Sequence, residues 1–160
     1  MELQVIEVEK PEGSNVILAQ SHFIKTVEDV YETLVSSVPS IRFGLAFNEA
    51  SGPCLTRSDG NDEELVEYAV RNAQKIKAGH LLVVMIRDAY PINLLNALKN
   101  VQEITSVYCA TANPLKAVVV SDGIGASILG VIDGSSPKGV ESQEEKTQRH
   151  EFLRKIGYKR

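Results

Sequence analysis

The chain has 160 residues, of which 43% are hydrophobic and 24% are charged, and its net charge is −4. This length is typical of one domain with one core, and the average composition argues against disorder and against a membrane-spanning protein. The acidic balance, with no visible basic groove, argues against a general nucleic-acid binder. A small anionic ligand stays compatible with it, because local backbone donors and one or two cations can hold a phosphate.

The N-terminal residues and the cysteines show no feature typical of an exported protein. The first residues lack the basic segment, apolar run and cleavage site of a secretory signal, so we expect a cytoplasmic protein. The two cysteines, Cys54 and Cys109, have no Cys or His at ligand spacing nearby. A zinc site or a disulfide would need distant partners, and two free thiols are the simpler interpretation.

The first third of the chain predicts strands, then a helix, then a strand. Residues 2–9 and 15–19 are short β-branched runs on either side of a Pro- and Gly-containing turn, which predicts a hairpin. Thr26 offers an N-cap, and apolar residues at helical spacing predict an amphipathic helix that ends before Pro39. Residues 41–47 predict a buried strand that runs into a loop of small and polar residues at 48–53.

The middle of the chain predicts a second helix and a central strand. Asn61, with Glu64 three residues on, opens the helix, and Gly79 ends it. Residues 80–86 form a continuous apolar run, which is typical of a strand covered on both faces. Pro91 stands where a first-turn proline belongs, at the start of a third, shorter helix.

The last part predicts three further strands and a final helix. The strands are expected at 106–110, 117–121 and 127–132, the last one after a loop that contains Gly123 and Gly125. Ser142 and Glu145 form a capping box that opens the final helix, and Gly157 closes it. The loop from 134 to 139, rich in Gly, Ser and Pro, is the best candidate for a mobile segment.

Interleaved strands and helices without an internal repeat predict an α/β fold. We expect a single domain over residues 1–160, with a mixed sheet covered by helices and a three-layer sandwich as the arrangement. Ligand sites in such folds commonly form at strand ends, where this chain places its unexplained polar residues.

His80 is the first candidate for chemistry, because it opens the most apolar strand of the chain. An imidazole held there, with one nitrogen facing a cleft, could act as a nucleophile. A half-buried histidine that caps the preceding helix is the structural alternative. His22 and His150 lack a comparable setting and read as solvated surface residues.

Asp88 follows the same strand and precedes the third helix. Its carboxylate could bind a ribose hydroxyl, orient an imidazole or hold a hydrated magnesium ion, or it could cap the helix. Asn93 and Asn96 lie three apart on one predicted helix face, and they could contact a purine or a phosphate or form a buried structural pair. Glu49 could be a base or metal ligand, or simply an exposed loop carboxylate.

The glycine-containing loops match neither common nucleotide motif. Ser51-Gly52-Pro53 is a small loop that a phosphate could approach, but it is not a Gly-x-x-x-x-Gly-Lys-Ser/Thr loop. Gly123 and Gly125 lack the third glycine of a Gly-x-Gly-x-x-Gly sequence, since Ile128 stands there. Cys109 reads as a buried strand residue.

Read together, several unusual runs resemble the adenosine-specific kinase family from about Arg42 onward. The matching runs are Phe43-Gly44 through Glu49-Ala50-Ser51-Gly52-Pro53, Gly60 to Leu65, Ala78-Gly79-His80, Arg87-Asp88-Ala89, Pro91-Ile92-Asn93, Cys109 to Pro114, Leu129 to Gly134, Gly139-Val140-Glu141, and Gly157-Tyr158-Lys159.

The resemblance implies a compact α/β protein that self-associates, binds adenosine nucleotides (AMP, ADP or ATP) and carries a phosphoryl group on a histidine. His80 is the histidine inside a matching run. The resemblance extends nucleotide binding to Gly52, Asp88, Asn93, Asn96, Thr111, Asn113 and Asp133. No metal-binding residue is assigned, and Mg²⁺ is left open as an accompanying ion. At Gly125-Ala126-Ser127 the chain departs from an expected Gly-Arg-Gly form, which bears on its phosphate affinity.

Three functions follow as hypotheses. The first is a phosphotransferase specific for adenosine nucleotides that works through a phosphohistidine. The second is a module that binds or senses adenine nucleotides without turnover. The third is an assembly protein whose apolar strands and final helix build an oligomer interface. No partnership with nucleic acid or membranes is expected.

Overall fold

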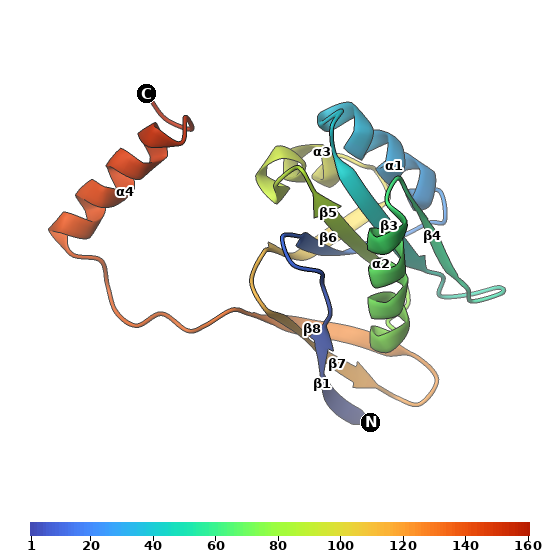
Figure 1. The fold of residues 1–160 in the computed structure, drawn as a ribbon. Coiled ribbons are helices and arrows are strands. Elements are labelled where there is room, and N and C mark those ends of the chain that lie inside the picture. Colours follow the sequence, from blue (N-terminus) through green and yellow to red (C-terminus); the bar gives the residue numbers. More distant parts are fainter.

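A computed structural model describes residues 1–160 as a layered α/β body with a projecting C-terminal helix (Figure 1). The strands are β1 (Glu2–Val8), β2 (Asn15–Ser21), β3 (Arg42–Asn48), β4 (Thr56–Gly60), β5 (Leu81–Arg87), β6 (Ile104–Thr111), β7 (Leu115–Ser121) and β8 (Ala126–Asp133). The helices are α1 (Thr26–Ser37), α2 (Glu63–Ile76), α3 (Leu95–Lys99) and α4 (Gln143–Lys155), with a short 3₁₀ turn at Pro91–Asn93. No helix is both long enough and apolar enough to cross a membrane.

The strands are divided between two sheets in which every pair is antiparallel. The larger sheet has the order β4-β3-β5-β2-β6, and the smaller one has the order β1-β7-β8. The α/β class and the sheet covered by helices are confirmed. The strands do not form one mixed sheet, because β1 pairs with β7 in the smaller sheet and not with any strand of the larger one.

The predicted hairpin of the first two runs is wrong. β1 pairs with β7, whereas β2 lies between β5 and β6 in the larger sheet. Residues 15–18 of β2 are buried, which is typical of a strand covered on both faces. Exposed residues of β1 fit a strand covered on one face only.

β5 is the central strand, as its apolar run predicts, and six of its seven residues are buried. The larger sheet separates two cores. On one face α1 and α3 pack on residues such as Phe43, Phe47 and Val84. On the other face α2 and the smaller sheet pack on residues such as Ala46 and Val83. These layers form the sandwich that positions the strand ends.

Helix boundaries differ from the predictions in their caps. Thr26 is the first helical residue of α1 rather than its N-cap, and its hydroxyl bonds to Phe23 and Ser21. Asp62, not Asn61, caps α2 by accepting from the Leu65 amide. The left-handed residue that ends α2 is Lys77 rather than Gly79. The capping box of Ser142 and Glu145 is confirmed.

Candidate functional site

His80 lies at one end of the larger sheet, immediately before β5. Its backbone amide donates to the Asn48 carbonyl (2.8 Å), and its carbonyl accepts from the Ser21 amide (2.9 Å). The backbone is left-handed, with φ of 61°, a conformation that is uncommon for residues other than glycine. Three strands therefore fix a strained histidine at a strand end, and such outliers concentrate at functional sites.

The imidazole of His80 is half-buried and has two ring neighbours. It stacks on Phe47, with centroids 6.0 Å apart and planes inclined by 17°. His22 stands edge-on to it, also at 6.0 Å between centroids. His80 does not cap α2, because Lys77 ends that helix. The capping alternative is therefore excluded, and His22, interpreted from the sequence as a solvated residue, is exposed but lies at the same site.

Glu49 and Arg57 lie on the same face of the sheet end as His80. Residues 47 and 57 are cross-strand partners, and partners point to one side of a sheet, so Arg57 shares the face of Phe47. The Arg57 guanidinium bonds Glu49 at 3.0 Å, and its Nε is buried without a hydrogen-bond partner. The Leu55 amide, aided by Arg57, lowers the pKa of the Glu49 carboxyl.

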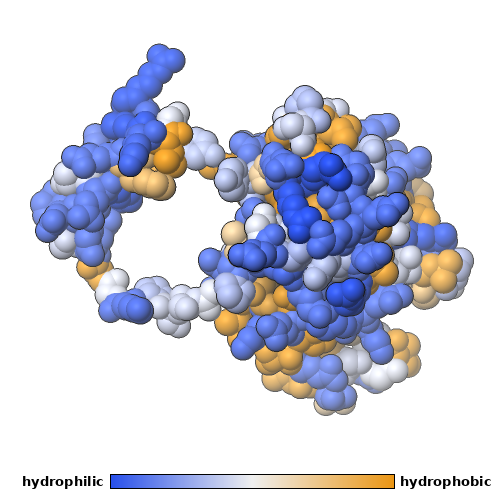
Figure 2. Space-filling view, viewed as in Figure 1, coloured by the Kyte–Doolittle hydropathy of each residue, from blue (hydrophilic) through white to orange (hydrophobic).

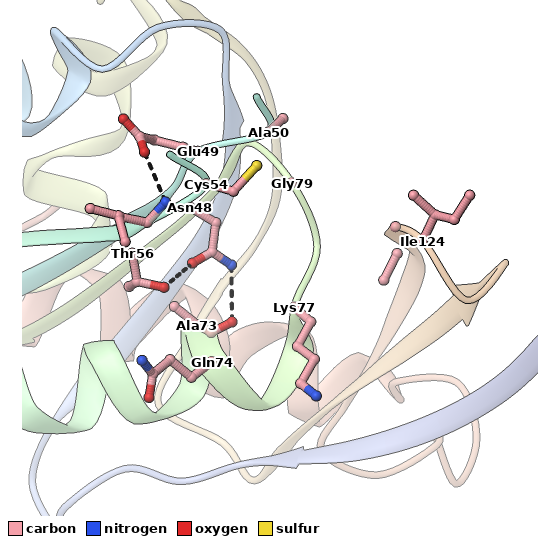
Figure 3. Close-up of a pocket in the computed structure, with 13 residues that line it drawn as sticks. Asn48, Glu49, Ala50, Cys54, Thr56, Ala73, Gln74, Lys77, Gly79 and Ile124 are labelled. Atoms are coloured by element: carbon pink, nitrogen blue, oxygen red, sulfur yellow. Dashed lines mark hydrogen bonds between the residues drawn. The ribbon is translucent and has the colours of Figure 1, made fainter. Parts of the chain in front are cut away.

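An open cavity of about 790 Å³ lies beside His80 on the other face of the sheet. It is formed by the β3–β4 loop, the C-terminal end of α2 and the β7–β8 loop (Figure 3). Its lining residues are Asn48, Glu49, Ala50, Cys54, Leu55, Thr56, Ala73, Gln74, Lys77, Gly79, Ile124, Gly125 and Ala126. A cavity of this size holds a ligand as large as a nucleotide.

The side chain of Asn48 links the elements at the floor of the cavity through three hydrogen bonds. Its amide nitrogen donates to the carbonyls of Ala73 (2.9 Å) and Ala78 (3.0 Å), and its oxygen accepts from the Thr56 hydroxyl (2.7 Å). Figure 3 shows the Asn48 amide turned toward α2 and the Glu49 carboxylate turned the other way. Asn48 and Glu49 are adjacent in the chain and therefore point to opposite faces of the sheet, Asn48 toward the cavity and Glu49 toward the face of His80.

Only two small residues, Ala50 and Gly79, form the rim between the cavity and His80. Gly79 and Ala50 meet there so closely that a Cβ on Gly79 would lie 2.9 Å from the Ala50 Cβ. No side chain larger than a methyl group stands at this contact. His80 itself is not among the lining residues, although its neighbour Gly79 is.

The structure does not bring His80 together with Asp88 and Asn93, although the resemblance implies that all three serve one adenosine nucleotide. His80 precedes β5 and Asp88 follows it, and at about 3.3 Å per residue the two lie more than about 20 Å apart. Asp88 is exposed and caps no helix. Asn93 accepts from the Tyr90 amide at the 3₁₀ turn, and Asn96 is exposed on α3, so they are not a buried pair.

Thr111, Asn113 and Asp133 also lie at the end away from His80, because Val16 pairs with Thr111 next to the Asn15–Ile86 pair. The Thr111 hydroxyl and the Asn113 amide both donate to one oxygen of Asp133, at 2.8 and 3.1 Å. This network secures the exit of the chain from β8. Gly52, at the tip of the β3–β4 loop with φ of 63°, lies at the His80 end but does not line the cavity.

Sequence reasoning did not select Arg57, Lys77 or Asn48. Arg57 lies on β4, a short polar strand whose sequence shows no alternation, so the pattern does not predict it. The structure contains no group of three or more His, Cys, Asp or Glu side chains that could hold a metal ion.

The fold and the strand-end cavity define an α/β sandwich protein with a nucleotide-sized site. A family model described as adenosine specific kinase matches residues 6–159. The chain belongs to the adenosine-specific kinase family, which confirms the resemblance seen in the sequence.

Among solved structures, the crystal structure of PH1918 protein from Pyrococcus horikoshii OT3 is similar over nearly the whole chain. It shares 45% sequence identity, covers 99% of this chain and 98% of its own, and has a TM-score of 0.95. Comparison with curated proteins found no match.

Proposed function

We propose that the protein transfers phosphoryl groups to or from adenosine nucleotides through a phosphohistidine at His80. Membership of the adenosine-specific kinase family supports the substrate class. The observation that carries the mechanism is the fixed, left-handed His80, with its ring stacked on Phe47 and held at a strand end beside a nucleotide-sized cavity. The protein acts as an enzyme in this proposal.

The adenosine would occupy the cavity and the phosphates would cross the rim of Ala50 and Gly79 toward the imidazole. The unprotonated ring nitrogen of His80 attacks the terminal phosphorus, a bond forms between nitrogen and phosphorus, and the bridging oxygen–phosphorus bond breaks. The shortened nucleotide leaves with that oxygen. The proton on the other ring nitrogen can pass to His22 or to water.

Arg57 supplies the cation that this step needs. Its guanidinium is partly exposed, with a side-chain exposure of 37%, so a ligand oxygen can accept from it while Glu49 holds the group in place. Arginine matches phosphate geometry better than lysine does. Glu49 holds the guanidinium in place through the 3.0 Å bond. Any Mg²⁺ would arrive with the nucleotide phosphates, since the protein offers no cluster of ligands for it.

The test is labelling with adenine nucleotide that carries ³²P in its terminal phosphate. Wild type should acquire acid-labile, base-stable label, and His80→Asn should acquire none. Asparagine tolerates the left-handed backbone, so this variant should fold. His150→Asn, on the exposed helix α4, is the matched control and should label normally. Equal label on wild type and His80→Asn would overturn the proposal.

A second function is favoured by one observation, namely that the cavity and the His80 ring lie on opposite faces of the sheet end. In this case the cavity binds an adenine nucleotide without turnover. Calorimetry that detects binding, together with no label and no phosphoryl exchange with or without Mg²⁺, would favour it.

A further inference from the structure

The cavity beside His80 offers few side chains that could recognise a base. The lining side chains that carry a polar atom are Asn48, Glu49, Cys54, Thr56, Gln74 and Lys77. The Asn48 amide uses both of its hydrogens on backbone carbonyls, and the Thr56 hydroxyl donates its hydrogen to Asn48. Glu49 can only accept and Lys77 can only donate, so neither presents both functions to a ligand.

Gln74 is the lining residue whose side-chain amide is free. It is exposed in the last turn of α2 (Figure 3), and its amide makes no hydrogen bond with any other group of the chain. A glutamine amide offers a donor and an acceptor side by side in one plane. It can therefore make two parallel hydrogen bonds to a flat ligand edge that presents an acceptor next to a donor.

The edges of the purine bases decide where such an amide is selective. At the Hoogsteen edge adenine presents the N7 acceptor beside the N6 donor, whereas guanine presents two acceptors, N7 and O6. An amide pairs with both adenine groups there, but in either orientation its oxygen faces an acceptor of guanine. At the Watson–Crick edge a rotated amide fits either base. A single glutamine therefore selects adenine only through N6 and N7.

Two exposed apolar side chains border the cavity on different loops. Leu55 on the β3–β4 loop is 50% exposed, and Ile124 at the tip of the β7–β8 turn is 99% exposed. Figure 2 shows hydrophobic surface on both of these projecting loops, at the right-hand side of the molecule. A purine ring is flat and apolar on both faces, so a bound base removes such side chains from water.

The turn that carries Ile124 is held in shape by its own hydrogen bonds. The Asp122 carboxylate accepts from the amides of Ile124 (2.9 Å) and Gly125 (2.8 Å). The Gly123 amide donates to the Ser121 hydroxyl (3.1 Å), and the Asp122 amide donates to the Gly125 carbonyl (3.2 Å). Because the turn satisfies its own amides, it presents Ile124 to solvent beside the cavity before any ligand arrives.

Lys77 lies between the free amide and the rim toward His80. It follows Gln74 by three residues, and Gly79 of the rim comes two residues later. The Lys77 ammonium is exposed and has no ion-pair partner in the chain, so it is free to bind a phosphate oxygen. Along this segment the group for the base, the group for a phosphate and the rim follow one another in the direction of His80.

We propose that Gln74 determines the specificity for adenine by pairing with N6 and N7 of the base, with Ile124 covering one face of the ring. The inference rests on the proposed adenosine site in the cavity, but it does not depend on phosphoryl transfer to His80. It assigns base recognition to two residues that neither the sequence patterns nor the family resemblance singles out.

Calorimetric titration of the full chain with AMP and with GMP tests this. Gln74→Ala should weaken AMP binding by roughly 5- to 150-fold, the range of a bidentate base contact, and leave the weaker GMP binding unchanged. Gln74→Arg should reverse the preference, because arginine matches the two acceptors of guanine. Gln148→Arg makes the same substitution on the exposed helix α4 and should keep the preference of wild type.

A modified base isolates the contact with N7. In 7-deaza-AMP a C–H group replaces N7, and the amino group is kept. Wild type should bind it about 2- to 12-fold more weakly than AMP, and Gln74→Ala should bind the two equally. A merely structural role of Gln74 would not move this ratio. Ile124→Ser should weaken AMP and GMP by the same factor, because both bases offer the same ring face.

Several results would overturn the inference and leave the proposed function intact. Unchanged AMP binding by Gln74→Ala would exclude the contact, and an equal loss of AMP and GMP binding would assign Gln74 a structural role. Equal binding of AMP and 7-deaza-AMP by wild type would exclude N7, and unchanged AMP binding by Ile124→Ser would exclude the ring contact.

Two further results separate this inference from the proposed function. A wild type that binds no adenine nucleotide would overturn both. Adenine selectivity that depends on Gln74, in a chain that acquires no label at His80, would support the inference and reject the phosphohistidine.

Discussion

The ring of Phe47 lies under the imidazole of His80, with the two planes inclined by only 17°. Phe47 is fully buried and lies in the middle of a core, so its position is fixed by its packing. A fixed ring makes a rigid support for a side chain that has to meet a phosphorus atom in line.

We therefore predict that Phe47→Leu leaves a folded protein with a slower phosphorylation of His80. Leucine keeps the site apolar at a cost of roughly 1–3 kcal/mol of stability, but it removes the stacking surface. Because a misplacement of about 1 Å can cost about 100-fold in rate, the labelling rate should fall by about 10- to 100-fold. The rate is measured with the ³²P nucleotide.

Phe43→Leu is the matched control for that experiment. Phe43 is equally buried in the same core but packs edge-on against Tyr31, with centroids 5.0 Å apart. It should lose similar stability and keep its labelling rate. Equal slowing in both variants would show that core stability, rather than the stacking contact, controls the rate.

Gly44 of β3 is required for the contact between the larger sheet and α2. A Cβ at this position would lie 2.1 Å from the Val66 amide nitrogen and 2.2 Å from the Leu65 carbonyl carbon. Backbone atoms of a helix cannot give way as a flexible side chain can. Gly44→Ala should therefore lower the free energy of unfolding by about 3 kcal/mol or more, or prevent folding.

Gly125→Ala is the control, because nothing lies within 4 Å of a Cβ added there. Its unfolding free energy should change by less than about 0.5 kcal/mol. Urea denaturation measures both variants. A Gly44→Ala protein as stable as wild type would contradict the close approach of α2 to β3.

The sequence predicts the elements of this fold better than it predicts which strands are neighbours. The continuous apolar run of β5 establishes a central strand, since only burial on both faces permits it. β1 and β2 are consecutive and joined by a turn-rich segment, which favours a hairpin, yet each finds a better partner far along the chain. β4 was missed because Thr56–Gly60 is short, polar and at an edge.

For the candidate site, too, the sequence predicts single residues better than it predicts which residues lie together. His80 stands out in the sequence because a histidine next to an apolar run is unusual. Arg57 lies on β4 and His22 follows the end of β2, and only the pairing of the strands brings them near His80. Asp88 and His80 both stand at strand ends, but they stand at opposite ends of the same strand, β5, so a site at the strand ends does not bring them together.

Acid should loosen the β3–β4 loop through Glu49. The pKa of this carboxyl is lowered, first by the Leu55 amide and then by Arg57. A carboxyl whose pKa is lowered in the folded state stabilises that state above its ordinary pKa of 4.5, and this contribution is lost as the pH falls through the lowered value.

Glu49→Gln should accordingly be less stable than wild type at pH 7 and converge with it in acid. Thermal unfolding of both proteins between pH 7 and pH 3 measures the difference. Glu12→Gln, on the exposed turn before β2, should track wild type at every pH. A difference between Glu49→Gln and wild type that does not shrink in acid would rule out the ionised carboxyl as its source.

The two cysteines should differ in reactivity in a way that reports on the cavity. Burial raises the pKa of the Cys109 thiol to about 11, so almost no thiolate is present at pH 8. Cys54 is exposed and lines the cavity. Iodoacetamide should therefore label one thiol rapidly, and Cys54→Ser should abolish the rapid phase, whereas Cys109→Ser should retain it.

A saturating adenine nucleotide should slow the alkylation of Cys54, because a ligand in the cavity covers the thiol. The uridine nucleotide at the same concentration controls for the phosphate charge and should protect less, since the family is specific for adenosine. Mass spectrometry of the Cys54 peptide gives the rate. Identical rates with and without the adenine nucleotide would place the nucleotide outside this cavity, and would leave the face that bears His80, Glu49 and Arg57 as the place to look for it.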